Sequence, residues 1–401
     1  MFFFIPAALL VVCSIINIWF RPSKKSHGYH RIRGSEESCL ILRNSDLKSR
    51  AEPNRRLTTA FGINNAFTTT DSDYHKAFVN QAKNLIRINE DEWTTLALAA
   101  ADIVHSSLTT LKDGPNAEPL LLVKFVQSLV FRIVIIKFFP ESDTPAAGDV
   151  HFITTKINSL WLASKRCSGE DPVTMLNDKK ELLRKLHSFI HPHSGFRDSN
   201  DEAGKENPLN WILPAYETLW RVVLHCFLEV RFRATLANAL VYQAAIERFF
   251  AQPCQATFDT PLSAAGVTVK NIVDESLSLY PPTRRINRQL PEEEVAIDIE
   301  YLHHDIKTWG VEALQFLPAR WPLKGAQKKV YMPFRIGRFE CPAKNTFGPM
   351  MIGILVGALI GGVGGRFEMV VDRVSGDVFG PGPLEGGREA YAGLRLRKVK
   401  N

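Results

Sequence analysis

Cys341 has the sequence surroundings that most directly suggest chemistry in this 401-residue chain. It lies in the stretch PFRIGRFECPA, shortly after Gly337 and Arg338. A cysteine thiolate can bind iron, and a glycine lets the backbone come close to a large flat ligand. A buried structural cysteine needs neither neighbour, so we expect Cys341 to bind a cofactor. An ordinary buried thiol is the alternative interpretation.

An acid and an alcohol, Glu217 and Thr218, stand side by side in the apolar segment NPLNWILPAYETLWRVV. Such a pair can carry protons into an otherwise apolar pocket through a hydroxyl group and water. Pro214 has no N–H group, so within a helix it frees the carbonyl group of Asn210 and predicts a local opening there. The alternative is a solvent-facing glutamate beside a threonine that only packs.

These two segments resemble the cytochrome P-450 family of haem-thiolate monooxygenases in motif order and spacing, and the resemblance extends from about residue 207 to the end. The family's loop beneath the haem carries four characteristic residues, which are here Phe334, Gly337, Arg338 and Cys341. Arg338 lies one place before the family's usual arginine, whose position Phe339 occupies. The resemblance implies a haem whose iron is bound by the Cys341 thiolate, with O2 as co-substrate.

The same resemblance assigns a structural role to Glu275 and Arg320. In the family this glutamate pairs with two arginines, one of which lies three residues further along its helix. That position is Ser278 here, and a serine hydroxyl group cannot form the two-pronged contact that an arginine makes with a carboxylate. We therefore hypothesise that haem retention is impaired, although not necessarily abolished.

Further contacts with the haem propionates are implied by resemblance alone. Arg284 or Arg285, in the stretch YPPTRR, corresponds to a residue that meets one propionate. His75 or Lys76, in the stretch DSDYHKAFVNQA, would meet the other. A surface position is the alternative for each of these side chains.

His303 and His304 belong to the residue types that bind metals, and Asp305 follows them directly. They lie in the stretch YLHHDIKTWG, which we interpret as a strand-to-loop passage of the same fold. For these three residues we expect a surface position rather than a metal site.

The expected fold is mainly α with a small β portion (α+β), as in cytochromes P-450, behind an N-terminal transmembrane helix. Apolar residues with helical spacing predict helices at 91–111, 120–139, 178–190, 211–250, 269–279 and 348–361. Three late segments read as strands: RRINRQL, EVAIDIEYL and FEMVVDRV. We expect a membrane anchor at 1–20, a basic linker at 21–50 and a catalytic domain at 51–401.

The run from Phe2 to Phe20 carries no charge and is nearly long enough to span a bilayer. The basic cluster from Arg21 to Arg33 follows it, which predicts an uncleaved anchor with the main domain in the cytosol, by analogy at the endoplasmic reticulum. A cleaved signal peptide is the alternative. The second apolar run, 350–363, is short and rich in glycine, so we expect it to pack in a soluble core.

The chain carries 49 Lys and Arg against 42 Asp and Glu, a formal net charge of +7. No nucleic-acid-binding motif accompanies this charge, so we expect no nucleic-acid partner. Five cations flank Cys341 in the sequence and could form a basic face for an acidic reductase: Lys328, Lys329, Arg335, Arg338 and Lys344. A solvated charged rim would look the same.

No nicotinamide or flavin motif is found, so electrons would come from NADPH through a partner flavin reductase. The resemblance implies insertion of one oxygen atom into an apolar organic substrate, with Glu217 and Thr218 delivering protons and helices before residue 207 lining the substrate pocket. Anchored fungal members of the family, many of them in secondary metabolism, are the nearest analogy. A degenerate member without turnover and an anchored interaction protein without cofactor are the alternatives.

Overall fold

The structure is a computed structural model that describes residues 29–111, 118–165, 172–191, 206–262, 266–323, 325–371, 379–380 and 382–399. The predicted membrane anchor, 1–20, lies outside the described residues. The segment expected as a linker is folded from residue 30 onward, where strand β1 and helix α2 begin. Strand β1 pairs with a strand from the second half of the chain, so the described part of the expected linker packs against the expected catalytic domain.

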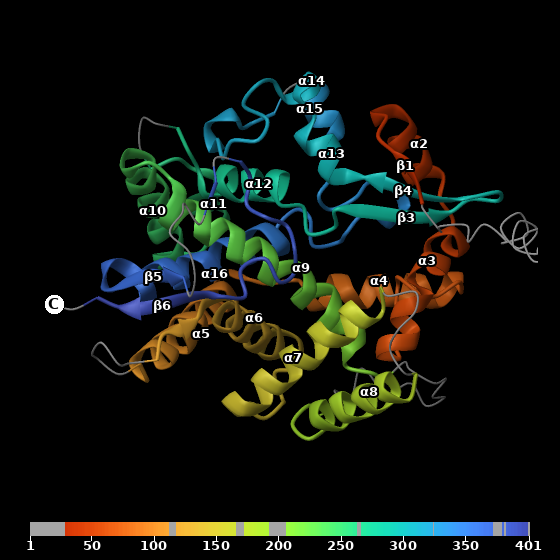
Figure 1. The fold of residues 1–401 in the computed structure, drawn as a ribbon, viewed down its shortest axis with the longest axis horizontal. Helices are drawn as coiled ribbons and strands as arrows, with labels where there is room; N and C mark the ends of the chain where they lie inside the picture. Colours follow the sequence, from red (N-terminus) through yellow and green to blue (C-terminus); the bar gives the residue numbers. More distant parts are fainter. Residues whose placement is uncertain are drawn as a thin grey trace, which may run out of the picture.

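Helices make up most of the described chain (Figure 1). The helices are α2 (Ser35–Asn44), α3 (Leu47–Phe61), α4 (Ser72–Leu85), α5 (Glu90–Thr109), α6 (Leu122–Phe138), α7 (Ala147–Ala163), α8 (Pro172–His187), α9 (Leu209–Leu228), α10 (Leu236–Ala251), α11 (Gln255–Asp259), α12 (Val269–Leu279), α13 (Ile299–His304), α14 (Ile306–Trp309), α15 (Gly325–Val330) and α16 (Phe347–Val363). The strands are β1 (His30–Ile32), β2 (Leu120–Leu121), β3 (Arg285–Gln289), β4 (Glu294–Asp298), β5 (Phe367–Val371) and β6 (Leu394–Lys398).

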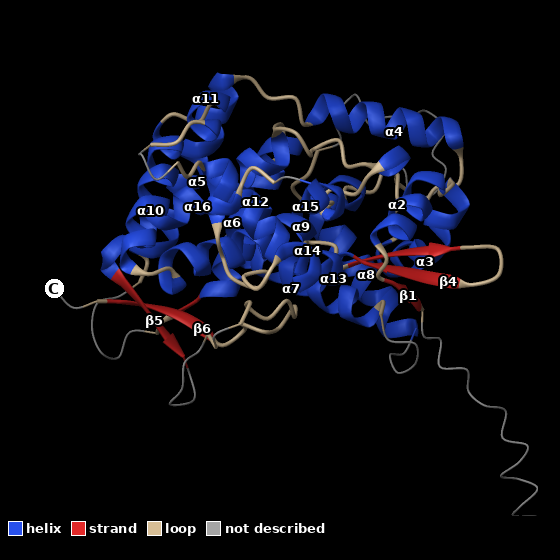
Figure 2. Cartoon of the chain, turned by 90° about the horizontal axis from the view of Figure 1, so that it is seen from above, coloured by secondary structure: helices blue, strands red, loops and turns tan. Residues whose placement is uncertain are grey.

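The strands form two small sheets at opposite ends of the molecule (Figure 2). In the first sheet, β4 lies between β1, which is parallel to it, and β3, which is antiparallel. In the second, β6 lies between β2 and β5, and both pairings are antiparallel. The predicted fold class, mainly helical with a small β portion, is confirmed.

Helix α16 contains the second apolar run and lies in the core, in contact with α5, α9, α10 and α12. It is apolar on all sides, so only burial on all sides removes its surface from water. Gly353 and Gly357 allow Phe249 and Phe250 of α10 to approach, because a Cβ atom at either glycine would lie 2.8 Å from a phenylalanine ring carbon. Among the described residues, the one helix long and apolar enough to cross a membrane is Phe347–Arg366, with 83% of its most apolar window buried. The expectation that this run packs in the core is confirmed.

Helix α9 passes through the middle of the helical layer and packs against α6, α12 and α16 (Figure 1). It continues through Pro214 without interruption, so the predicted local opening is wrong. The side-chain amide of Asn65 donates to the carbonyl oxygen of Asn210 at 3.3 Å. A tertiary donor thus satisfies the carbonyl group that proline leaves without its helical partner.

Candidate active site

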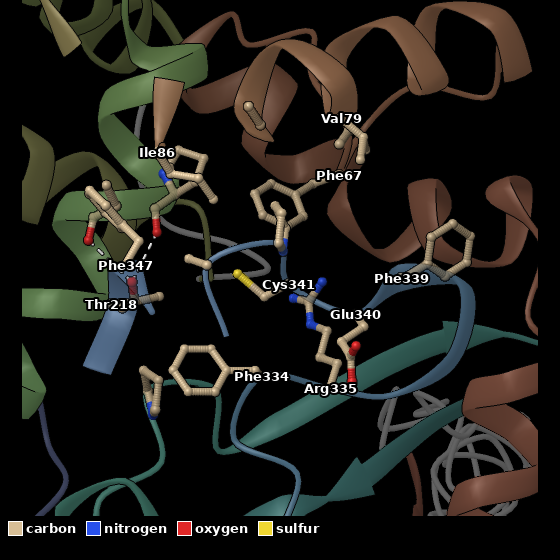
Figure 3. Close-up of a pocket in the computed structure, with 18 of the residues that line it drawn as sticks. Phe67, Val79, Ile86, Thr218, Phe334, Arg335, Phe339, Glu340, Cys341 and Phe347 are labelled. Atoms are coloured by element: carbon tan, nitrogen blue, oxygen red, sulfur yellow. Dashed lines mark hydrogen bonds between the residues drawn. The ribbon is translucent and has the colours of Figure 1, made fainter. Parts of the chain in front are cut away.

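A cavity lies between α9, α4 and the loop that precedes α16 (Figure 3). Its empty volume is about 1360 Å³, which includes space open to solvent. Cys341 and Thr218 both line it, so the structure brings together two of the residues that the sequence singled out. Most of the remaining lining is apolar and comes from α4, α6, α9 and α16.

The cysteine loop is closed by its own backbone. The N–H group of Cys341 donates to the carbonyl oxygen of Phe334 at 2.9 Å, and that of Glu340 donates to Gly337 at 3.1 Å. Gly337 has a φ of 73°, in the left-handed region. A Cβ atom there would lie 3.0 Å from the Cα atom of Arg43 in α2. The glycine therefore permits the loop to lie close to α2, and this contact explains its presence without an approach to a cofactor.

The Cys341 thiol group is subject to opposing influences. Burial is the largest influence and raises the pKa of the thiol above its usual value, while the backbone N–H of Ala343 and the positive charges of Arg335 and Arg50 offset part of that rise. Donors and positive charge of this kind stabilise the thiolate form once a metal is bound. The sulfur is thus a neutral thiol while no metal is bound, and its surroundings contain the donors and positive charges that would stabilise the thiolate of a metal ligand.

Thr218 faces the cavity and Glu217 does not. The Thr218 hydroxyl group donates within its own helix, to the carbonyl oxygens of Pro214 at 2.9 Å and Ala215 at 3.1 Å. Glu217 lies on another side of α9, where it forms a buried ion pair with Arg388. Arg388 also donates to the side chain of Asn158 in α7 at 3.0 Å. Successive residues of a helix point about 100° apart, so an adjacent acid and alcohol need not share one pocket.

Glu275 is buried and has three donors. Arg320 pairs with its Oε1 atom at 3.3 Å, and the N–H of Leu317 donates to the same atom at 2.8 Å. The indole N–H of Trp321 donates to Oε2 at 2.8 Å. The predicted pairing of Glu275 with Arg320 is present. Both carboxylate oxygens therefore have a donor, although position 278 is a serine.

The arginines expected at a propionate lie elsewhere. Arg284 pairs with Glu300 at 2.6 Å, and Arg285, which is exposed, lies 3.9 Å from Asp298. Neither arginine lines the cavity. Both arginines lie near carboxylates of β4 and α13, so the structure gives no support for the predicted propionate contact.

His75 lines the cavity, while Lys76 forms a surface ion pair with Asp73 at 3.2 Å. Of these two alternatives, the structure therefore favours His75. Its ring stands edge-on to Phe339, with centroids 5.6 Å apart. Burial and the neighbouring charges of Arg50 and Arg338 lower its pKa to about 4.

His303 is fully buried, so the expected surface position is wrong. Its Nε2 atom accepts from the N–H of Met332 at 3.1 Å, and its Nδ1 atom lies 3.1 Å from the carbonyl oxygen of Ser278. This arrangement fits a neutral ring that donates through Nδ1. No cluster of three metal-ligand side chains occurs in the part of the chain that the structure describes. The residue is a structural link between α12 and α13.

Sequence reasoning missed Arg50 and the inward orientation of Arg335, both of which line the cavity beside Cys341. Arg335 was expected on an outer basic face. Its position next to Phe334 was a usable signal, because it lies inside the cysteine loop. Nothing local marked Arg50, which reaches the site from α3, far away in the sequence.

These residues fit a haem. The Cys341 thiol group faces an apolar cavity, with Arg335 beside it (Figure 3). Arg50 lines the same cavity and adds positive charge. The Nε atom of Arg50 is buried and has no hydrogen-bond partner among the described residues. A flat, largely apolar ligand with an anionic edge would complement each of these features.

Solved cytochrome P-450 structures superpose on nearly the whole chain. CYP175A1 from Thermus thermophilus matches with a TM-score of 0.62 and 14% identity, over 98% of this chain and 96% of that chain. Cytochrome P-450 OleT in complex with arachidonic acid matches with a TM-score of 0.60 and 12% identity, over 92% of this chain and 89% of that chain. The protein therefore has the cytochrome P-450 fold.

Curated relatives match over a shorter segment. Cytochrome P-450 714A2 of Arabidopsis thaliana is 30% identical over 110 residues, 23% of this chain and 21% of that protein. Cytokinin hydroxylase of the same plant is 27% identical over 106 residues, 23% of this chain and 20% of that protein. No protein-family model matches the chain. The chain spans about a fifth of the length of the curated relatives it matches. In sequence as well as in fold it is related to the cytochromes P-450, as its motifs predict.

Proposed function

We propose that this chain is a haem-thiolate monooxygenase that inserts one oxygen atom of O2 into an apolar organic substrate. The observation that carries the proposal is the meeting of Cys341 and Thr218 in one apolar cavity, on a cytochrome P-450 fold. Cys341 would hold the haem iron through its thiolate, and the bound haem would supply the activation of O2. His75 and the arginines beside the cysteine loop would hold the anionic edge.

Thr218 would hold a proton at its Oγ1 atom, on the side of α9 that faces the cavity. Its hydroxyl group already points at two carbonyl oxygens of its own helix, so it can accept from water while donating to the backbone. Glu217 would act only through a route that passes its ion pair with Arg388, because it does not line the cavity. Of the predicted acid–alcohol pair, Thr218 therefore lines the cavity and Glu217 lies outside it.

The substrate would be apolar because the lining is. Phe67, Phe78, Val79, Ile86 and Phe138 form much of the wall and exclude water from it. All five precede residue 207, as expected for the substrate-contacting part of the chain. Arachidonic acid, bound by the fold relative OleT, shows that this fold admits a long apolar chain, and this agrees with the proposal.

Electrons would come from NADPH through a flavin reductase that docks on the face outside the cysteine loop. Lys328, Lys329 and Arg338 are exposed there. The other two expected cations contribute less, since Arg335 turns into the cavity and Lys344 pairs with Glu340 at 2.6 Å. A membrane anchor at 1–20, location at the endoplasmic reticulum and a part in secondary metabolism belong to this proposal as expectations from the sequence.

The absorption spectrum of the reduced full-length protein under carbon monoxide tests the proposal. A band shifted to long wavelength, absent in Cys341→Ser, is expected for a thiolate ligand. Product formation from a panel of apolar substrates, with NADPH and a flavin reductase, then tests turnover. Absence of haem from the wild-type protein would contradict the proposal and favour an interaction protein without cofactor.

A second candidate function is haem binding without turnover. The ion pair of Glu217 with Arg388 favours it, because it keeps the acid out of the cavity in which a proton would be needed. The carbon monoxide spectrum would then show the thiolate band, while no substrate would be oxidised.

A further inference from the structure

Three arginines gather beside the cysteine loop without a carboxylate to balance them. Burial is the main cause that lowers the pKa of Arg50, Arg288 and Arg335. The charges that act on the three groups come from one another and from Cys341, and none comes from an Asp or Glu of the described chain. Buried cations that repel one another destabilise a fold unless an anion joins them.

Arg50 is held in place with its hydrogen-bonding capacity largely unused. Its guanidinium group lies over the rings of Phe339 at 4.5 Å and Phe67 at 4.8 Å. One nitrogen lies 3.3 Å from the Nε2 atom of His75, and the Nε atom is buried without a partner. Aromatic faces fix the direction of a guanidinium group without consuming its in-plane N–H donors. Those donors remain free for a ligand.

Arg335 is held by its backbone. Its φ of 65° is uncommon for a residue with a side chain, and it follows directly on Phe334 at the start of the cysteine loop. This conformation turns the side chain into the cavity, beside Cys341 (Figure 3). Its guanidinium group packs at 5.2 Å from the Phe67 ring and makes no side-chain hydrogen bond with the described residues.

Arg288 differs from these two. Its Nε atom donates to the Ser45 hydroxyl group at 3.1 Å, and another nitrogen donates to the carbonyl oxygen of Asn287 at 2.8 Å. It does not line the cavity. Of these three arginines, Arg50 and Arg335 are the ones that line the cavity with free donors, and Arg338, which also lines the cavity, is exposed to solvent.

We propose that Arg335 and Arg50 bind the carboxylates of the haem, and that Arg335 supplies the cation that related proteins carry at the position of Phe339. Phe339 cannot donate a hydrogen bond to a carboxylate, but its ring supports the guanidinium group of Arg50. The inference rests on the proposed function and names residues that neither the motifs nor the comparisons assign. Arginine suits this task, since its paired N–H groups match a carboxylate.

Haem retention by the full-length protein tests the proposal. We expect Arg335→Met to lose haem to an excess of apomyoglobin about 10- to 100-fold faster than wild type, the range for a lost hydrogen bond to a charged group. Arg50→Met should behave similarly. Lys344→Met removes an exposed cation of the same loop that does not line the cavity, so it is the matched comparison and should change the rate by less than about threefold. Arg335→Lys should lose haem more slowly than Arg335→Met, because lysine restores the positive charge but not the paired N–H donors of arginine.

Haem with both carboxylates esterified keeps the flat porphyrin and lacks the two negative charges, so it tests whether the arginines recognise those charges. Wild type should lose the diester faster than haem, whereas Arg335→Met should lose both at similar rates. If wild type holds the diester as firmly as haem, the haem carboxylates are not the ligands of these arginines and the proposal fails. It also fails if Arg338→Met, and not Arg335→Met, loses haem.

Thermal unfolding of the haem-free full-length chain tests whether Arg335→Met loses haem only because its fold is less stable. Removal of an unpaired buried cation should leave the midpoint of haem-free Arg335→Met equal to wild type or above it. A lower midpoint in the haem-free state would mean that Arg335 supports the fold itself, and would overturn the inference. A wild-type protein that takes up no haem at all would overturn the proposed function and, with it, this inference. If wild type binds haem and Arg335→Met loses it no faster, the inference is overturned while the proposed function stands.

Discussion

Arg388, close to the C-terminus, forms a buried ion pair with Glu217 in the middle of α9. The two side chains are 8% and 5% exposed, so the pair is almost fully removed from water. Arg388 also reaches α7 through Asn158, and its guanidinium group lies 5.1 Å from the Trp161 ring. The C-terminal segment therefore fixes the acid that the sequence places beside Thr218.

Loss of Arg388 should destabilise the protein strongly. Arg388→Met leaves Glu217 buried without its cation, and removal of one partner of such a pair costs about 3 kcal/mol or more. Urea unfolding of the single variants and of Arg388→Met with Glu217→Gln gives the coupling energy. Lys76→Met, which breaks a surface pair with Asp73, should change stability by less than about 1 kcal/mol. A coupling near zero would contradict the buried pair.

The hydroxyl group of Thr218 should matter for turnover and not for haem content. Thr218→Val keeps the shape of the side chain and removes the proton carrier, so product formation should fall by about 100-fold. Haem content and the carbon monoxide spectrum should stay as in wild type, because among the described residues the hydroxyl group bonds only within α9. Thr218→Ser serves as the control that keeps the hydroxyl group. Equal product formation by Thr218→Val and wild type would remove Thr218 from the mechanism.

An arginine restored at position 278 should not improve the protein. Ser278 is buried, and the Glu275 carboxylate already has three donors from Leu317, Arg320 and Trp321. A large side chain at a buried position typically costs about 1 to 3 kcal/mol through overpacking. We therefore expect Ser278→Arg to lower the melting temperature and leave haem content unchanged or reduced. A rise in both would instead support the hypothesis that Ser278 impairs haem retention.

His303 should make stability depend on pH. Burial lowers its pKa from 6.5 to about 3, so the native ring stays neutral where the unfolded chain takes up a proton. Its contribution to stability is present above pH 6.5 and is lost as the pH falls towards 3, with a slope of about 1.4 kcal/mol per pH unit. Urea unfolding between pH 4 and 7 measures that slope. His303→Gln should reduce it, and His187→Gln, an exposed histidine in α8, should not.

Much of the fold and part of the site were predictable from the sequence. The apolar, glycine-rich run at 350–363 could satisfy its backbone only as a buried helix, and it is α16. Cys341 and Thr218 were recognisable because each lies within a local motif. Glu275 and Arg320 were recognised as a pair by resemblance to a family, and the structure brings them together.

What the sequence left open are contacts between segments far apart in the chain. Local spacing correctly predicted that Pro214 frees a carbonyl group, but only the tertiary structure supplies Asn65 to satisfy it. Adjacent Glu217 and Thr218 suggested a shared task, yet the helical turn of about 100° per residue directs one to Arg388 and the other to the cavity.

The sequence by itself determined the helical class, the cysteine loop and the alcohol of the site, since these depend on residue type and short spacing. The tertiary structure alone decided which charges face the ligand. Arg50 and Arg335 meet beside Cys341 from α3 and the cysteine loop, while Arg284 and Arg285 are drawn to Glu300 and Asp298. The physical reason is that a buried charge takes the partner that folding brings within reach, and sequence distance does not limit that choice.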